Sequence, residues 1–233
     1  MKIKIYGDGA DLKSILKARD EGIIDGVTTN PTLMKAAGIK DYEKFAKEVL
    51  EKITLLPISF EVFSDDFENM EREAKIINSW GDNVNVKIPI TNTKGESSIP
   101  LIEKLIKEGI KLNVTAIFTI KQLEELKEVI DYNDSIILSI FAGRIADAGI
   151  DPMLIVKKAR QEIFSMHDNV EILWASTREV LNIVQAEECG CDIITVTYDI
   201  LKKLPSLGKD LTEFSLDTVK MFYNDAKESG FKI

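Results

Sequence analysis

The stretch Val84-Asn85-Val86-Lys87-Ile88-Pro89-Ile90 has the composition of a buried β-strand that ends at a proline. Comparable short β-branched runs recur at fairly even intervals along the chain. They begin near Ile3, Gly26, Pro57, Val84, Ile110, Ser135, Glu171 and Asp192. The sequence therefore predicts eight strands.

Segments with helical spacing of apolar residues lie between these strands. The predicted helices are Asp11–Asp20, Tyr42–Ile53, Asp66–Trp80, Ile99–Lys107, Thr119–Ile130, Pro152–Phe164 and Arg178–Glu188. Regular alternation of strands and helices indicates a parallel sheet. A further amphipathic helix is predicted over about 215–232, with an apolar face suited to packing on the barrel or on a neighbouring subunit.

Eight β-α units can close into a barrel, and a chain of 233 residues is of ordinary length for one. An open dinucleotide-binding sheet would carry a G-x-G-x-x-G turn after its first strand. Here Leu12 stands where the third glycine of that motif would be, three residues after Gly9. We therefore expect an α/β fold, a single (β/α)₈ TIM barrel that spans residues 1–233 as one domain with an additional C-terminal helix.

Composition excludes several classes of function. The net charge of −9 argues against nucleic acid and anionic membranes as partners. No apolar run approaches the length of a membrane span, and the N-terminus lacks signal-peptide features, so we expect a cytoplasmic protein. His167 is the only histidine and cannot complete a zinc-ligand set with Cys189 and Cys191, so no metal is expected. Acid-base chemistry must then use carboxylates, lysine, tyrosine or water.

Polar residues gather at the predicted carboxyl ends of the strands, where barrel enzymes carry their active sites. Every one of the eight units contributes at least one of them. In chain order they are Asp8, then Thr28, Thr29 and Asn30, then Glu61, Lys87, Asn113 with Thr115, Ser139 with Arg144, Ser176 with Arg178, and Thr195 with Thr197.

Lys87 is the most informative of these residues. A lysine in a strand usually extends to the surface or pairs with a carboxylate. At the mouth of a barrel, however, desolvation would lower its pKa and leave a neutral amine that can attack a ketone. The polar residues around it favour this second interpretation, in which Lys87 forms a Schiff base.

The carboxylates divide between structural and chemical roles. Glu61 lies among apolar neighbours, so it is either an ion-pair partner for a lysine or a proton carrier. Asp11 directly precedes a helix and is assigned as its N-cap, which leaves Asp8 for chemistry. Asn113 and Thr115 point to the same face of their strand, and we expect that face to be the inside of the barrel.

Arg144 and Arg178 are predicted to begin or precede helices in adjacent units, with Ser176 at the end of its strand close to the helix that contains Arg178. A lone arginine is usually a solvated surface residue. Two arginines near helix N-termini, together with a serine, indicate a phosphate site.

Five separated motifs resemble the transaldolase family over essentially the whole chain. They are Gly26-Val27-Thr28-Thr29-Asn30-Pro31-Thr32, Val86-Lys87-Ile88-Pro89, Leu112-Asn113-Val114-Thr115, Ser139-Ile140-Phe141-Ala142-Gly143-Arg144-Ile145 and Ala175-Ser176-Thr177-Arg178. The length resembles the compact branch, which includes the fructose 6-phosphate aldolases. Its members commonly form pentamers or decamers through a C-terminal helix, so the resemblance implies a homo-oligomer.

The resemblance implies a role for each candidate. Lys87 resembles the Schiff-base lysine, Glu61 and Thr115 resemble the pair that holds the catalytic water, and Asp8 resembles the acid-base group. The substrate-binding candidates are Thr28, Asn30, Asn113, Ser139, Phe141, Arg144, Ser176 and Arg178, of which Ser176, Arg178 and Arg144 resemble the phosphate ligands. One departure is Gly9, where the family usually has Ser or Thr, and it predicts a looser turn after Asp8.

Three positions favour transfer over release. The aldolase branch usually has Gln, Tyr and Lys where this chain has Glu61, Phe141 and Arg178. Because phenylalanine cannot protonate the bound three-carbon unit, that unit should wait for an acceptor. The resemblance thus implies a transaldolase of the pentose phosphate pathway that moves a dihydroxyacetone unit between sugar phosphates without a cofactor. The alternatives are a fructose 6-phosphate aldolase that releases dihydroxyacetone and a non-catalytic sugar-phosphate-binding barrel.

Overall fold

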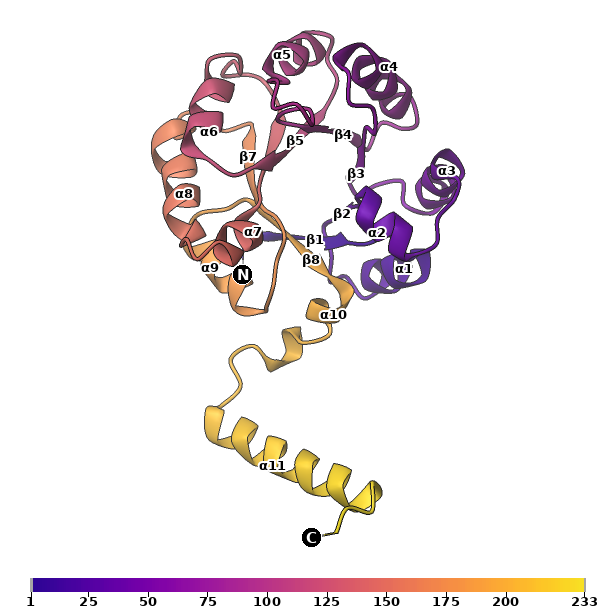
Figure 1. Cartoon of the computed structure of the whole chain (residues 1–233), viewed down its shortest axis with the longest axis vertical. Helices are drawn as coiled ribbons and strands as arrows, with labels where there is room; N and C mark the ends of the chain where they lie inside the picture. The colour runs from indigo at the N-terminus through magenta and orange to yellow at the C-terminus, as the bar shows by residue number, and fades with distance from the viewer. Residues whose placement is uncertain (1, 233) are drawn as a thin grey trace. The chain divides into compact units, whose positions relative to one another are not determined.

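The computed structural model describes residues 2–232, and eight parallel strands in it form a closed barrel in sequence order (Figure 1). The strands are β1 (Lys4–Asp8), β2 (Gly26–Thr28), β3 (Ile58–Glu61), β4 (Val84–Pro89), β5 (Leu112–Ile117), β6 (Ile136–Ile140), β7 (Val170–Trp174) and β8 (Ile193–Thr197). The predicted (β/α)₈ TIM barrel is confirmed, and each predicted strand start lies within two residues of the observed one.

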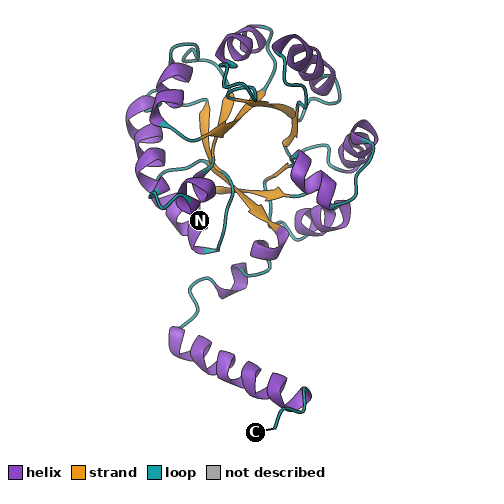
Figure 2. Cartoon of the chain, in the orientation of Figure 1, coloured by secondary structure: helices purple, strands orange, loops and turns teal. Residues whose placement is uncertain are grey.

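Helices surround the barrel on its outside (Figure 2). They are α1 (Leu12–Asp20), α2 (Pro31–Ala36), α3 (Tyr42–Lys52), α4 (Phe67–Asn78), α5 (Ile99–Lys107), α6 (Ile120–Lys127), α7 (Ala142–Asp147), α8 (Pro152–Lys158), which continues as a π-helical turn (Ala159–Ile163), α9 (Leu181–Glu188) and α10 (Tyr198–Leu201). Side-chain caps at Asp11, Asp41, Asp66 and Thr119 satisfy backbone N–H groups where α1, α3, α4 and α6 begin.

The predicted start of one helix was wrong. We expected a helix from Arg178, but α9 begins at Leu181. The side-chain oxygen of Asn182 accepts hydrogen bonds from the backbone N–H groups of Arg178 (2.8 Å) and Glu179 (3.2 Å). These two residues are therefore held in a turn ahead of the helix, at the pocket rim.

The chain forms two compact units, the first ending at Leu201 and the second beginning at Lys202. The second unit contains a short 3₁₀ turn (Leu204–Ser206) and α11 (Leu211–Glu228). The helix predicted over 215–232 thus begins and ends about four residues earlier, because Asp210 caps it through the N–H groups of Thr212 and Glu213. Its apolar side chains are exposed, among them Val219 (60%) and Phe222 (62%).

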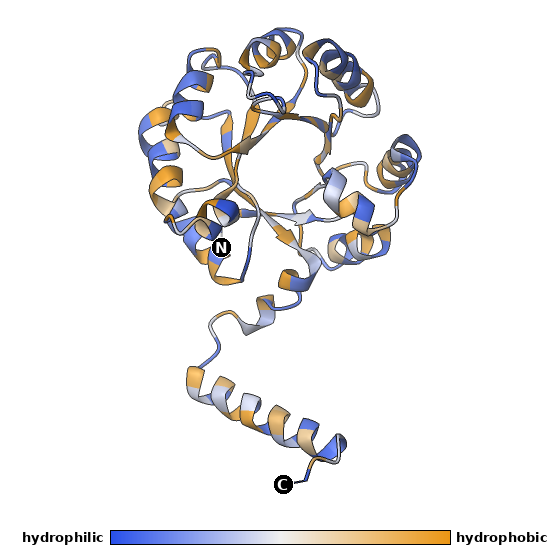
Figure 3. Ribbon diagram, viewed as in Figure 1, coloured by the Kyte–Doolittle hydropathy of each residue, from blue (hydrophilic) through white to orange (hydrophobic). Residues whose placement is uncertain are grey.

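The core is apolar on both sides of the sheet, and Figure 3 shows the strands as mainly hydrophobic. In β4, Val84, Val86 and Ile88 are almost fully buried. Asn85 and Lys87 lie on the other face of this strand, because successive side chains alternate. Asn85 lines a pocket of about 380 Å³, and Lys87 lines another of about 510 Å³. The two mouths of the barrel are thus chemically distinct.

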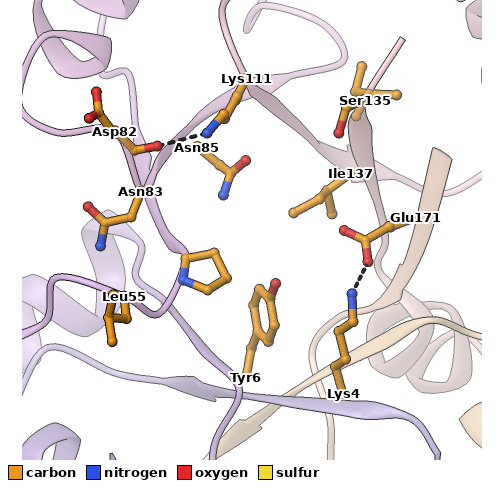
Figure 4. A pocket seen from close by; sticks show the side chains of 12 residues that line it. Lys4, Tyr6, Leu55, Asp82, Asn83, Asn85, Lys111, Ser135, Ile137 and Glu171 are labelled. Carbon is orange, nitrogen blue, oxygen red and sulfur yellow. Dashed lines mark hydrogen bonds and ion pairs between the residues drawn. The ribbon is translucent and has the colours of Figure 1, made fainter. Parts of the chain in front are cut away.

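The pocket at the amino ends of the strands is bordered by two lysines that have partners within the protein (Figure 4). Lys4 Nζ lies 2.5 Å from Glu171 Oε1, which links β1 to β7. Lys111 Nζ donates to the backbone carbonyl of Asp82 (2.8 Å). Tyr6 also lines this mouth and packs against Ile137, Leu173, Ala175 and Ile193. Because both lysines already have partners within the protein, we assign these contacts a structural role.

Candidate active site

The pocket at the carboxyl ends of the strands has a volume of about 510 Å³ and is lined by every catalytic and substrate-binding candidate predicted from the sequence, whereas Thr29, also named at a strand end, does not line it. Its lining includes Asp8, Thr28, Asn30, Glu61, Lys87, Asn113, Thr115, Ser139, Phe141, Arg144, Ser176 and Arg178. It also includes Thr195 and Thr197 from β8 and the apolar side chains of Leu33 and Phe118. Residues from all eight strand ends therefore meet in one cavity, as the position of the active site in barrel enzymes requires.

Lys87 is 6% exposed and lies at the base of this pocket. Its Nζ atom donates to the carbonyl oxygen of Thr29 (3.1 Å) and lies 3.1 Å from Glu61 Oε2. Glu61 and Lys87 are direct neighbours in the β3–β4 register, so the sheet places the two residues side by side. The lysine thus pairs with a carboxylate and also borders the cavity.

Asp8 lies beside this pair at the end of β1. Its Oδ1 atom accepts a hydrogen bond from Thr28 Oγ1 (2.9 Å) across the β1–β2 pair. Burial raises the pKa of Asp8 above the usual carboxyl value, and the positive charge of Lys87 offsets only part of that rise. Asp11, by contrast, is the N-cap of α1 as predicted, and its carboxylate accepts from Ser14 N (3.0 Å).

A buried polar network connects three strands beneath the cavity. Asn113 Nδ2 donates to Ser59 Oγ (3.1 Å), and Ser139 Oγ donates to Asn113 Oδ1 (2.6 Å). The network fixes the orientation of the Asn113 amide. Nearby Thr115 is 2% exposed, and its hydroxyl has no hydrogen-bond partner among residues 2–232. A buried hydroxyl without a partner at the wall of a polar cavity is suited to bind a water molecule or a substrate oxygen.

Backbone strain is concentrated at the same pocket. Among residues 2–232, the non-glycine residues with positive φ are Ala116 (59°) and Ser176 (66°), and both line the cavity. Ala116 lies where the pairing of β5 with β6 shifts register between Val114 and Ile117. Strained backbone of this kind is characteristic of functional sites.

The two arginines are held at the rim by different contacts. Arg178 donates from Nη2 to Asp147 Oδ2, and the two side chains are about half exposed. The Arg144 guanidinium lies 5.9 Å from the centroid of the Phe141 ring. Gly143 lets the start of α7 approach the segment after β7 closely, since a Cβ atom at this position would lie 1.6 Å from the carbonyl oxygen of Ser176.

Asn30 has a structural contact in addition to its place in the pocket. Its Oδ1 atom accepts from Leu33 N (3.0 Å) and caps α2. The side-chain oxygen is therefore occupied, whereas the amide nitrogen is the group of Asn30 that a ligand would meet.

Gly9 is explained by a residue that sequence reasoning did not single out. A Cβ atom at Gly9 would lie 2.6 Å from Cε2 of Tyr198, and one at Gly7 would lie 2.8 Å from the Tyr198 hydroxyl oxygen. The ring of Tyr198 thus occupies the space that side chains at these positions would need. The expected looseness of the turn is replaced by close packing between β1 and α10.

Two further partners of the candidate residues were missed, Asp147 on Arg178 and Tyr42 on the backbone of Glu61. Asp147 lies three residues after Arg144 in α7, a spacing that would suggest a pair with Arg144, but its observed partner Arg178 is 31 positions away and has no signal in the sequence. Tyr42 has no such signal either, because it is separated from Glu61 by 19 positions and contacts only main-chain atoms.

Within residues 2–232, no group of three or more His, Cys, Asp or Glu side chains is arranged to hold a metal ion. Over the same residues, no helix combines the length and apolar character that crossing a membrane requires.

Comparisons with known proteins give a consistent result. The family model described as Transaldolase/Fructose-6-phosphate aldolase matches residues 5–233. The chain is 36% identical over 225 residues to a "Probable transaldolase" of Thermoplasma volcanium, covering 94% of this chain and 96% of that one. It is 37% identical over 218 residues to a "Probable transaldolase" of Nitrosopumilus maritimus, covering 92% of each chain. Among solved structures, it is similar in fold to 3-hexulose-6-phosphate synthase from Salmonella typhimurium, with a TM-score of 0.60, 13% identity and coverage of 87% and 96%.

Proposed function

Because the chain belongs to the transaldolase/fructose-6-phosphate aldolase family, we propose that it is a transaldolase that uses Lys87 as a Schiff-base nucleophile. The donor is a ketose phosphate, sedoheptulose 7-phosphate or fructose 6-phosphate, and the acceptor is an aldose phosphate. The observation that carries the proposal is the position of Lys87, a buried amine that borders a polar cavity and lies 3.1 Å from Glu61.

The first half of the reaction breaks a carbon-carbon bond. The Lys87 amine adds to the C2 ketone, and loss of water gives a protonated imine. Asp8 takes the proton of the C4 hydroxyl, the C3–C4 bond breaks, and its electron pair moves into the imine to form an enamine. An aldose phosphate leaves, and dihydroxyacetone stays attached to Lys87. The raised pKa of Asp8 suits this role, because it makes the carboxylate a stronger base.

The second half forms a new bond. The enamine carbon attacks the aldehyde carbon of the acceptor, and Asp8 returns the proton to the new C4 oxygen. Water then hydrolyses the imine and releases the product ketose phosphate. The imine is the electron sink throughout, so the chemistry needs no cofactor, and we expect activity to be insensitive to EDTA.

Glu61 and Thr115 are proposed to hold the water that leaves and returns at C2. Glu61 Oε2 lies next to Lys87, and the buried Thr115 hydroxyl has no partner in the part of the chain that the structure describes. Asn113, Ser139, Asn30 and Thr28 line the cavity around this point and are proposed to contact sugar hydroxyls.

Arg144, Arg178 and Ser176 are proposed to bind the phosphate. Guanidinium groups form charge-assisted hydrogen bonds to phosphate oxygens. All three residues line the same pocket. The segments that carry them are brought together where Gly143 approaches the carbonyl oxygen of Ser176. They supply local positive charge on a chain whose net charge is −9.

The alternative within the same family is an aldolase that releases free dihydroxyacetone. Phe141 favours transfer, because its ring lies in the pocket against Phe118 (5.6 Å between centroids) and offers no proton to the enamine. Measuring product formation from fructose 6-phosphate with and without erythrose 4-phosphate separates the two reactions. A transaldolase should turn over only with the acceptor present, whereas an aldolase should not need it.

We further propose a cytoplasmic homo-oligomer of the pentamer or decamer type that acts in the pentose phosphate pathway. Support for self-association comes from the exposed apolar side chains of α11, which are costly to leave in water.

The decisive experiment is reduction with sodium borohydride in the presence of fructose 6-phosphate, followed by mass spectrometry of the intact chain and its peptides. A dihydroxyacetone-sized adduct on Lys87 is expected. The Lys87→Arg variant keeps the charge beside Glu61 and should give no adduct and at least ~10³-fold lower activity. A folded wild-type protein without an adduct would overturn the proposal and favour a non-catalytic sugar-phosphate-binding barrel.

A further inference from the structure

Strand β2 is too short to cover the full length of its neighbour β3. It pairs with β3 at Val27–Ile58 and Thr28–Ser59. One more contact follows, from Thr29 N to Ser59 O (3.3 Å), before the chain turns into α2 at Pro31. The β2 side of β3 therefore has no strand partner at Glu61, the residue whose side chain meets Lys87.

The backbone of Glu61 faces this uncovered side. Ile58 N donates to Asn83 O (2.9 Å) and Val62 N donates to Lys87 O (3.2 Å), so the even-numbered residues of β3 face β4. Main-chain groups of successive residues point to opposite neighbours in a sheet. The N–H and C=O of Glu61 consequently point toward the place that a longer β2 would occupy.

The hydroxyl of Tyr42 fills that place. It accepts a hydrogen bond from Glu61 N (2.8 Å) and donates one to Glu61 O (3.1 Å). A single side-chain oxygen thus supplies both contacts that a neighbouring strand would have made. Only a neutral phenol can do both, and burial raises the pKa of Tyr42 far above its ordinary value.

The ring of Tyr42 is fixed independently of Glu61. It begins α3 directly after the Asp41 cap. Its centroid lies 4.4 Å from that of Phe63, 5.5 Å from Trp80 and 6.0 Å from Phe60. The hydroxyl is therefore held in place by packing, so it can restrain the main chain of Glu61.

We propose that Tyr42 is a positioning residue for Glu61. By restraining the Glu61 backbone, it keeps the carboxylate 3.1 Å from Lys87 and directed into the pocket. Tyr42 itself does not line the active pocket and acts only through Glu61. This inference rests on the proposed role of Glu61 in Schiff-base formation and hydrolysis, and it adds the element that sets the geometry of that step.

The Tyr42→Phe variant tests the proposal because it removes one oxygen and leaves the ring among its aromatic neighbours. We expect kcat to fall by ~10- to 100-fold, since small displacements of a catalytic group have effects of this size. The KM for fructose 6-phosphate should stay within about twofold, because the proposed phosphate and hydroxyl ligands are untouched. Tyr132→Phe, which removes an exposed hydroxyl, is the matched control and should retain wild-type kcat.

A double-mutant cycle with Glu61→Gln distinguishes positioning from general stabilisation. If Tyr42 acts through the Glu61 carboxylate, Tyr42→Phe should change kcat by less than about twofold in the Glu61→Gln background. Equal effects in both backgrounds would assign Tyr42 to stability alone and overturn the proposal. Wild-type kcat in the single variant would do the same.

The borohydride adduct of the wild-type protein and the kinetics of the Tyr42→Phe variant test the proposed function and the positioning role separately. Failure of the wild-type protein to form the borohydride adduct would overturn the proposed function, whereas a wild-type adduct with an unaffected Tyr42→Phe variant would overturn the positioning role alone. If Tyr42→Phe does not fold, two tyrosine analogues at position 42 give the same test. 4-Aminophenylalanine keeps a group that can both donate and accept, so kcat should stay within about twofold of wild type. 4-Fluorophenylalanine cannot donate to Glu61 O and should lower kcat by ~10- to 100-fold. Equal kcat values in the two proteins would refute the proposal.

Discussion

Asp8 is a buried carboxyl group with a raised pKa and a proposed role in proton transfer. Its carboxyl group lies at the end of β1 next to Thr28, and burial raises its pKa more than the nearby charge of Lys87 lowers it. A carboxyl group with a raised pKa in the folded state destabilises the fold once it ionises. Catalysis and stability therefore place opposite demands on this residue.

The Asp8→Asn variant should separate these demands. We expect activity to fall by ~10²- to 10⁴-fold through loss of the general base. At neutral pH the variant should unfold at a higher temperature than wild type, because the buried charge is gone. Below the ordinary carboxyl pKa, Asp8 is protonated in both states, so the difference should vanish. Thermal unfolding from pH 3 to 8 measures this, and a variant less stable than wild type at neutral pH would contradict it.

Arg178 provides a second prediction at the scale of single residues. Charge-assisted hydrogen bonds contribute about 1.5–3 kcal/mol, so Arg178→Ala should raise the KM for fructose 6-phosphate by ~10- to 100-fold. The kinetics with unphosphorylated fructose should be unchanged, and Arg72→Ala, an exposed arginine of α4, serves as control. An equal loss with both sugars would show that Arg178 supports the fold of the rim through Asp147 and does not select phosphate.

The residues that line the pocket were predictable from the sequence, because a closed barrel brings the carboxyl ends of its strands together regardless of the loop conformations. Lys87, Glu61 and Asp8 could each be predicted to line the pocket from their place at or near the carboxyl end of a strand. Tyr42 and Asp147 could not, since their contacts depend on where α3 and α7 pack. The partner of a catalytic residue is set by tertiary geometry, which leaves little trace in local sequence.

At the scale of elements, the packing of α10 on β1 explains why glycine follows Asp8. The Gly9→Ser variant should place its Cβ 2.6 Å from Tyr198 Cε2, closer than van der Waals contact allows, and destabilise the protein by ~1–3 kcal/mol, as overpacking does. Adding Tyr198→Leu should recover part of this loss by making room. Urea unfolding of the two single variants and the double variant gives the coupling, and strictly additive effects would mean that the two residues do not compete for space.

The sequence predicted the long helices, whereas it did not reveal the short helices α2 and α10. Strands show as β-branched runs, and helices such as α4 and α5 show their period over two or more turns. α2, with six residues, and α10, with four, are too short to display a period. The early end of β2 was likewise invisible, because the motif Gly26–Thr32 continues past the point where strand pairing stops.

At the scale of the whole molecule, α11 carries the prediction about assembly. Val219 and Phe222, which are 60% and 62% exposed, lie one turn apart on this helix. Replacing both with Glu should shift the protein toward the monomer in light scattering after size exclusion, since charges oppose burial of that face. Thr212→Glu, a polar position near the start of α11, is the control. An unchanged mass for the Val219→Glu/Phe222→Glu variant would exclude this face from the interface.

The division of the barrel into two mouths has a consequence for evolution and engineering. The mouth at the amino ends is bordered by the Lys4–Glu171 pair and by the contact of Lys111 with Asp82, at residues that contribute nothing to the pocket around Lys87. Stabilising substitutions can accumulate there without altering substrate contacts, because the two sites share no side chain. Such a reserve of stability would let the other mouth tolerate more substitutions in its lining. Selection for a change in the proposed sugar specificity should therefore succeed more often when it starts from a chain already reinforced at the amino ends of its strands.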